Sequence, residues 1–425
     1  MLKRPLLAGI LPSRFLLLLS VLGPGIITAN ADNDASGIFG YSMAGAQYGY
    51  KMLWVLVLST IALGVAQEIC ARMGAVTGRG LADLIREEYG PKITLFAMTA
   101  LLIANFATTV SEFAGILAGV QLFLPPQIAR FIVLPIAGMG VFLAVTRGSY
   151  RKLEKFLLGA SLIYLLYIVS AVMSHPDWGQ IAHSAFVAPF AGVHNVNAYV
   201  FIVINIIGTT ITPWGQFYIQ SSVRDKGVKP HEFKLLRMDV MFGAFFTTFI
   251  ASAIVICCGT MLYPHPELHN LQDAGQAAAA LAPLAGKFAS VIFAIGLINA
   301  SMFGAIAVPL STAYAITESL GWESGVGRRI KEAPLFIGIF TLLIIASVLT
   351  VMVFPHHLSS LIILPNVVGG ALLPIILVLM LLLVNKRRLM GTFVNSPAYN
   401  AIAWTTTVVI AVLSLTLLIT TLLPH

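Results

Sequence analysis

The chain has 425 residues, of which 58% are hydrophobic and only 10% are charged, and its mean hydropathy is +0.91. About a quarter of the residues are charged in a typical soluble domain, and a soluble core could not bury this much apolar surface. The composition excludes a soluble domain, so the net charge of +8 does not indicate nucleic-acid binding. It predicts an all-α polytopic membrane protein whose main partner is the lipid bilayer.

Apolar stretches of about twenty residues are long enough to cross a bilayer as helices. Eleven such stretches are predicted, and polar or helix-breaking residues interrupt the first and the sixth. They lie near residues 15–48, 52–71, 93–122, 129–146, 156–174, 197–222, 239–263, 288–316, 334–354, 358–384 and 400–422. An alanine-rich stretch near 268–285 predicts a short helix outside the membrane.

Basic residues are segregated between the predicted loops. All but three of the 25 Lys and Arg residues fall on the side of the predicted membrane that holds the N-terminus, and the exceptions are Lys51, Arg130 and Lys287. Since cytoplasmic loops carry an excess of Lys and Arg, the N-terminus is predicted to be cytoplasmic and the C-terminus to lie outside. The short loops indicate a bacterial inner membrane.

The first predicted span is interrupted between Gly23 and Gly37, where two aspartates and two asparagines stand between apolar flanks. A charge near the bilayer centre costs roughly 2.5–3.5 kcal/mol on insertion scales, so Asp32 and Asp34 require a cation or a wet cavity. Ser36 and the glycines indicate a locally unwound helix whose freed carbonyls can also bind an ion. The first break therefore predicts a cation site.

The sixth span is interrupted at residues 208–216. Pro213 lacks an amide proton and clashes with the preceding turn, while Gly215 loosens the next one. Interrupted spans at corresponding positions of two halves point to a transporter site. The sequence therefore predicts a single domain, 1–425, with repeats near 15–174 and 197–384 and an extra helix near 400–422. The alternative is a proline kink beside an incidental polar patch.

The two breaks gather oxygen ligands and no sulfur. The second break adds threonine hydroxyls, backbone carbonyls and the side-chain amide of Gln216. Oxygen-only sites suit Mg²⁺, Ca²⁺ or Mn²⁺, and few carboxylates with several neutral oxygens fit Mg²⁺, which keeps much of its water. The metal is expected as a substrate, and no cofactor is expected.

Two further acids, Glu68 and Glu112, lie in apolar spans. Intramembrane acids are functional candidates, either as proton carriers or as neighbours of the ion. For Glu68 the alternative is a group near the inner interface that pairs with Arg72 four residues on. None of the nine histidines lies in a predicted span, so a histidine proton relay is not expected.

Three stretches resemble the natural resistance-associated macrophage protein (Nramp) family. They are residues 44–56, residues 71–82 with the sequence ARMGAVTGRGLA, and residues 389–395. The resemblance covers most of the chain. It implies divalent metal transport by a leucine-transporter-like fold of two inverted five-helix repeats.

This sequence departs from the family pattern at the residues expected to bind the ion. The family's Asp-Pro-Gly-Asn motif in the first break corresponds to residues 34–37, so the resemblance keeps Asp34 as a metal ligand and replaces the Asn by Gly37. Its Met-Pro-His in the sixth helix corresponds to residues 212–214, so that Thr212 replaces the methionine and Trp214 the histidine. The resemblance also places a carbonyl ligand at Thr209.

Elsewhere, Thr109 replaces the aspartate of the third helix's acid pair while Glu112 remains, and Asn366 replaces the tenth helix's glutamine. These departures resemble the Nramp-related magnesium transporter branch, which lacks the methionine and the usual proton coupling. A site that exchanges sulfur for oxygen loses its discrimination against hard ions.

We therefore expect a secondary transporter that imports divalent cations, including Mg²⁺ and Mn²⁺, with weak or no proton coupling. One alternative is a proton-coupled Mn²⁺/Fe²⁺ importer with Glu68, Glu112 and Asp32 as its acids, and the others are an amino-acid symporter of the same fold and a structural or receptor-like protein. An enzyme is not expected, and a monomer is compatible with the sequence. The predicted metal site is Asp34, Thr209, Thr212, Gly37 and Asp32, surrounded by Glu112, Glu68, Asn33, Trp214, Gln216 and Asn366, with Pro213, Gly215 and Ser36 at the breaks.

Overall fold

The structure is a computed structural model that describes residues 23–422, except residues 188, 192, 194, 270, 272, 273, 286, 356 and 357. The described residues form helices, short helical turns and loops, with no strand. The start of the first predicted span, near residue 15, lies outside them, as do the N-terminal residues on which the prediction of a cytoplasmic N-terminus partly rests.

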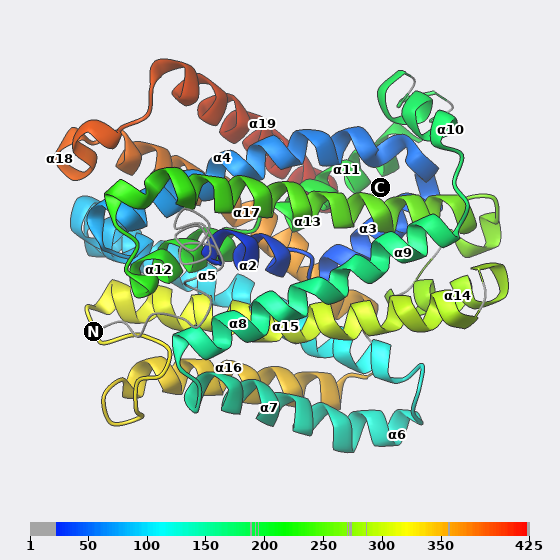
Figure 1. The fold of residues 1–425 in the computed structure, drawn as a ribbon, viewed down its shortest axis with the longest axis horizontal. Helices are drawn as coiled ribbons and strands as arrows, with labels where there is room; N and C mark the ends of the chain where they lie inside the picture. The colour runs from blue at the N-terminus through cyan, green and yellow to red at the C-terminus, as the bar shows by residue number, and fades with distance from the viewer. Residues whose placement is uncertain are drawn as a thin grey trace, which may run out of the picture.

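Long helices run side by side through the molecule, and some of the shorter ones lie at their ends (Figure 1). The α-helices are α2 (Pro24–Ala31), α3 (Ala35–Tyr48), α4 (Leu53–Thr77), α5 (Leu81–Val120), α6 (Pro126–Ile128), α7 (Leu134–Thr146), α8 (Tyr150–Ser161), α9 (Leu165–Met173), α10 (Trp178–Ala182), α11 (Val196–Thr210), α12 (Pro213–Lys226), α13 (Phe233–Met261), α14 (Ala274–Ala285), α15 (Lys287–Leu320), α16 (Pro334–Val353), α17 (Leu358–Val384), α18 (Arg387–Met390) and α19 (Pro397–Leu422). The predicted short helix near 268–285 is present as α14.

Among the described residues, nine helical segments are long and apolar enough to cross a membrane, or ten if the bent pair Val368–Val384 and Arg387–Phe393 forms one span. One segment, Ala35–Thr77, has 43 residues. At 1.5 Å per residue it would be ~64 Å long, about twice the hydrocarbon thickness of a bilayer. A turn at Gly49, whose φ is 60°, divides it into α3 and α4. With this segment counted as two spans and the bent pair as one, the described residues hold eleven spans, which is the number predicted.

Both predicted helix breaks are present. The first separates α2 from α3 at residues 32–34, and the second separates α11 from α12 at residues 211 and 212. Each new helix begins with a side-chain cap, because Asp34 accepts the N–H of Gly37 (2.7 Å) and Thr212 accepts the N–H of Gly215 (3.3 Å). Such caps satisfy the amides that a helix start leaves free. The residues at each break therefore determine where the next helix begins.

One end of the bundle carries the basic loops, and we call it the basic end (left in Figure 1). Ion pairs join helices there: Lys226 of α12 to Glu154 of α8 (2.6 Å), and Lys386 to Glu88 of α5 (2.8 Å). Lys51 lies at the opposite end, where its carbonyl accepts a hydrogen bond from Tyr199 (3.3 Å). The segregation of basic residues is therefore a property of the fold, while the side that faces the cytoplasm stays a prediction.

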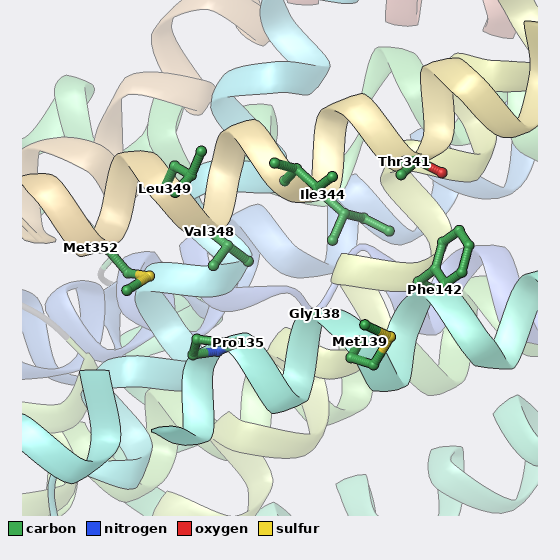
Figure 2. A pocket seen from close by; sticks show the side chains of 10 residues that line it. Pro135, Gly138, Met139, Phe142, Thr341, Ile344, Val348, Leu349 and Met352 are labelled. Atoms are coloured by element: carbon green, nitrogen blue, oxygen red, sulfur yellow. The ribbon is translucent and has the colours of Figure 1, made fainter. Parts of the chain in front are cut away.

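An apolar groove of about 420 Å³ lies between α7 and α16 (Figure 2). Its walls are formed by side chains such as Met139, Phe142 and Ile344. The only hydroxyl in it, that of Thr341, donates to the carbonyl of Ile337 (2.7 Å). The groove offers no ligand set for an ion, so an ion site has to be sought at the helix breaks.

Candidate metal-ion site

The two helix breaks meet at a small cavity between α3, α5, α11, α12 and α17. Asp34 and Ser36 line it from the first break, and Thr212 and Trp214 line it from the second. Asn366 of α17 also lines the cavity. Predicted site residues from three distant parts of the chain are thus brought together.

Asp34 supplies the negative charge of the cavity. Its side chain is almost fully buried, with 1% of the residue's surface exposed. One carboxylate oxygen, Oδ1, accepts both the N–H of Gly37 (2.7 Å) and the hydroxyl of Ser36 (2.7 Å). No ion pair to this carboxylate occurs among the described residues. A buried carboxylate without a basic partner is the arrangement expected for a cation ligand.

Glu112 of α5 lies beside the first break. Its Oε2 accepts the backbone N–H of Ala35 (3.2 Å), and its Oε1 has no hydrogen-bond partner. α15 approaches closely because residue 304 is glycine: a Cβ there would lie 2.5 Å from the Glu112 carboxyl carbon. Glu112 thus lies next to the first break, and its role as a proton carrier or a neighbour of the ion stays a prediction.

The second break frees a backbone carbonyl. In a continuous helix the carbonyl of Thr209 would accept the N–H of residue 213, but Pro213 has no N–H to donate. The Thr209 hydroxyl lies 3.4 Å from the Ser36 hydroxyl, so this turn faces the first break. A Cβ at residue 37 would lie 3.1 Å from the Thr209 hydroxyl, and Gly37 therefore allows the two breaks to approach.

Next to Asn366, which was predicted, the structure places Asn205, Asn105 and Thr108, which the sequence analysis missed. The Asn366 side-chain oxygen lies 3.1 Å from the Ser36 hydroxyl oxygen, whose proton points to the nearer Asp34. The Asn366 amide donates to Asn205 of α11 (2.6 Å). Asn105 and Thr108 of α5 also line the cavity. Each is a polar side chain inside an apolar run, which was the available signal, but the sequence does not show which way such a side chain points.

Asp32 turns away from this cavity. One of its oxygens accepts the Thr212 hydroxyl (2.7 Å) and the other accepts the side-chain amide of Gln67 on α4 (3.1 Å). Gln67 was not predicted as a site residue. Thr212 therefore stands between the two aspartates, with Asp34 and Asp32 on different sides.

Three other predicted residues take different positions. The Asn33 amide donates to the carbonyl of Thr247 on α13 (3.0 Å), which directs it away from the cavity. The Gln216 amide donates to the Thr212 carbonyl (3.4 Å), one turn along α12. Trp214 lines the cavity with its ring, and its indole N–H has no partner.

Glu68 lies outside the cavity and forms the alternative arrangement, an ion pair with Arg72. It pairs with Arg72 (3.2 Å), which also donates to the carbonyl of Phe393 (2.9 Å) and to Asn395. The interpretation of Glu68 as a neighbour of the ion is therefore not supported by its position. A helical i, i+4 pair explains it.

The donor set of the cavity is hard. The described residues contain no group of three or more His, Cys, Asp or Glu side chains that could hold a metal ion. An ion would instead rest on one or two carboxylates with hydroxyl, amide and carbonyl oxygens. Such donors suit Mg²⁺, Ca²⁺ and Mn²⁺ better than soft metals. Fold and site together define a polytopic helical membrane protein with an anionic, oxygen-lined cavity at paired helix breaks.

The chain belongs to the natural resistance-associated macrophage protein-like (Nramp) family, whose sequence profile matches residues 25–420. It is 26% identical over 414 residues to the divalent metal cation transporter MntH of Ralstonia nicotianae, covering 94% of this chain and 90% of the relative. It is 27% identical over 417 residues to MntH of Bradyrhizobium diazoefficiens, covering 96% and 90%. These matches confirm the family and agree with the expectation that the chain is not an enzyme.

Solved structures confirm the fold. The manganese transporter of Eremococcus coleocola, in complex with an aromatic bis-isothiourea substituted compound, superposes with a TM-score of 0.75 at 21% identity, covering 95% of this chain and 88% of that one. MhsT in complex with L-phenylalanine superposes with a TM-score of 0.60 at 12% identity, covering 96% and 98%. The predicted leucine-transporter-like architecture with broken first and sixth helices is therefore correct.

Proposed function

We propose that this chain is a secondary transporter that imports divalent metal cations through the cavity at the two helix breaks. The names of the relatives, divalent metal cation transporters and a manganese transporter, support the substrate class. We further propose that it carries Mg²⁺ as well as Mn²⁺, as in the magnesium transporter branch that the sequence resembles. The observation that carries this step is the oxygen-only lining, with Thr212 at the wall.

Each residue of the cavity has its own proposed role in binding the ion. Asp34 binds the ion through its carboxylate, directly or through water, and Thr209 offers the carbonyl that Pro213 leaves free. Thr212 offers a hydroxyl or room for a bound water. One carboxylate with neutral oxygens suits an ion that keeps part of its hydration shell, as Mg²⁺ does. Glu112 deepens the negative potential from α5.

Weak proton coupling follows from the other substitution at the second break. Trp214 lines the cavity where the family carries a histidine, and an indole ring does not titrate near neutral pH. The ion then moves down its own gradient as the two halves of the protein rock around the site. With the basic end on the cytoplasmic side, an ion that moves toward this end enters the cell.

A proton-coupled Mn²⁺/Fe²⁺ importer is the second candidate. It is favoured by Glu112, which lies next to the break with one carboxyl oxygen unpartnered. An amino-acid symporter is less compatible with the structure. The N–H of Gly37, which could have bound a substrate carboxylate at the start of α3, already donates to Asp34.

The test is uptake of Mn²⁺ into proteoliposomes by the wild type and by Asp34→Asn. Removing the charged ligand of a buried cation costs about 3 kcal/mol or more, so uptake should fall about a hundredfold. Asp177→Asn is the matched control, because Asp177 caps α10 outside the cavity by accepting the Gln180 N–H (3.0 Å). Undiminished uptake by correctly inserted Asp34→Asn would refute the proposal.

A further inference from the structure

Asp32 is a second buried carboxylate that the Asp34 cavity does not use. Only 1% of its surface is exposed, and it takes part in no ion pair among the described residues. Its two hydrogen-bond partners, Thr212 and Gln67, are neutral. Two neutral donors compensate a buried negative charge incompletely.

Gln67, which bonds to Asp32, and Gln216, which bonds to Thr212, each have an unpaired side-chain oxygen. The amide of Gln67 donates through Nε2 to Asp32, and the amide of Gln216 donates through Nε2 to the carbonyl of Thr212. Both side chains are fully buried, and the Oε1 atom of each has no hydrogen-bond partner. Buried carbonyl oxygens normally find a donor. Unpaired oxygens of this kind, beside an incompletely compensated carboxylate, suit a hard cation.

The position of this cluster separates it from the first cavity. Thr212 contacts both, since its hydroxyl donates to Asp32 and the residue also lines the cavity of Asp34. Gln67 lies on α4 ten residues before the helix end at Thr77, ~15 Å from the basic end. Gln216 follows Thr212 by one turn on α12, a helix that also runs to the basic end.

We propose that Asp32, Gln67, Thr212 and Gln216 form a second binding site for a hard divalent cation, which the ion occupies after Asp34 on its way to the basic end. The inference rests on the proposed function, because the ion is the transported one. Two divalent ions so close together would repel each other, so the two sites fill in turn. Thr212 connects the two sites: its hydroxyl donates to Asp32 and accepts the N–H of Gly215, and one lone pair of the oxygen remains for an ion.

Kinetics separate this site from the first one. An ion still loads at Asp34 when Asp32 is neutral, so Asp32→Asn should keep KM for Mn²⁺ while its maximal rate falls about tenfold. Gln67→Leu, which removes an oxygen ligand and no charge, should lower the maximal rate in the same way. An unchanged maximal rate in both variants would show that Asp32 is neutral and structural. A raised KM at constant maximal rate would show that Asp32 belongs to the Asp34 site.

Equilibrium binding gives a readout that does not depend on transport. Mn²⁺ binding, followed by electron paramagnetic resonance, should persist in Asp34→Asn and disappear when Asp32→Asn is added. The matched control is Asp239→Asn in the same background, since Asp239 is equally buried but its carboxylate accepts the N–H groups of Gly23 (3.0 Å) and Gly25 (2.6 Å). Loss of all binding in Asp34→Asn alone would overturn the second site while leaving the proposed function intact.

Discussion

The two helix breaks are capped in the same way but by chemically different side chains. Each is followed by a helix whose first residue is capped by a side chain, Asp34 at α3 and Thr212 at α12. The first cap is a carboxylate and brings charge. The second is a hydroxyl, and the proline behind it frees the carbonyl of Thr209. Under the proposed function, the first break supplies the attraction for a cation and the second supplies the choice among cations.

Neutralising Asp34 has the largest expected effect, and the next largest is expected from closing the second break. Pro213→Ala restores an N–H that can bond to the Thr209 carbonyl, so the helix becomes continuous and the carbonyl is no longer free. We expect uptake of both ions to fall about tenfold or more, while the melting temperature stays the same or rises. Pro334→Ala is the control, because Pro334 starts α16 away from the cavity. Equal losses in both variants would contradict a role for the freed carbonyl.

Thr212→Met sharpens the comparison by adding sulfur to the second break only. A thioether favours softer metals, so the ratio of Mn²⁺ to Mg²⁺ uptake should rise about tenfold. Competition between the two ions in proteoliposomes measures this ratio. Thr212→Val removes the hydroxyl without adding sulfur and should weaken the uptake of both ions alike. A ratio that moves equally in both variants would remove the sulfur argument.

Glu112→Gln tests the charge around the first break. A glutamine oxygen can still accept the N–H of Ala35, so the main change is a weaker negative potential at Asp34. KM should rise about fivefold for Mg²⁺ and Mn²⁺ alike, which corresponds to ~1 kcal/mol. Ser111→Ala, which removes a neighbouring buried hydroxyl without a partner, should leave KM unchanged. A KM unaffected by Glu112→Gln would remove this residue from the site.

Glu68→Gln should have the smallest effect on transport. Glu68 pairs with Arg72 outside the cavity, so KM and the maximal rate should stay at wild-type values. Weakening a buried ion pair lowers stability, and the melting temperature should drop by about a few degrees. Thermal unfolding and uptake on the same preparation check both statements. A changed KM would return Glu68 to the list of residues that sense the ion.

The sequence predicted the two breaks because their signals are local. Proline, glycine and capping residues act on their own turn, so Asp34, Thr212 and Pro213 could be placed without tertiary information. The direction in which each side chain points could not be predicted from such local signals. Asn33 points to α13 and Asp32 points to Gln67, although both stand beside Asp34 in the chain.

The partners from other helices were the hardest to foresee. Asn205 and Gln67 stand inside apolar runs, and whether such a residue faces the cavity or a neighbouring helix depends on the rotation of that helix in the bundle. Rotation is set by packing against elements far away in the sequence. The same limit explains Glu68, whose partner Arg72 was visible in the sequence but whose distance from the cavity was not.

The most direct test of an oxygen-lined, proton-uncoupled site is ion uptake into proteoliposomes of purified protein, with Mg²⁺ and Mn²⁺ offered separately and internal pH recorded in the same experiment. The account predicts saturable entry of both ions without acidification, and loss of both in Asp34→Asn. Entry of Mn²⁺ but not Mg²⁺, accompanied by acidification, would contradict it and would return the chain to a proton-coupled mechanism with Glu112 and Asp32 as the acids to test.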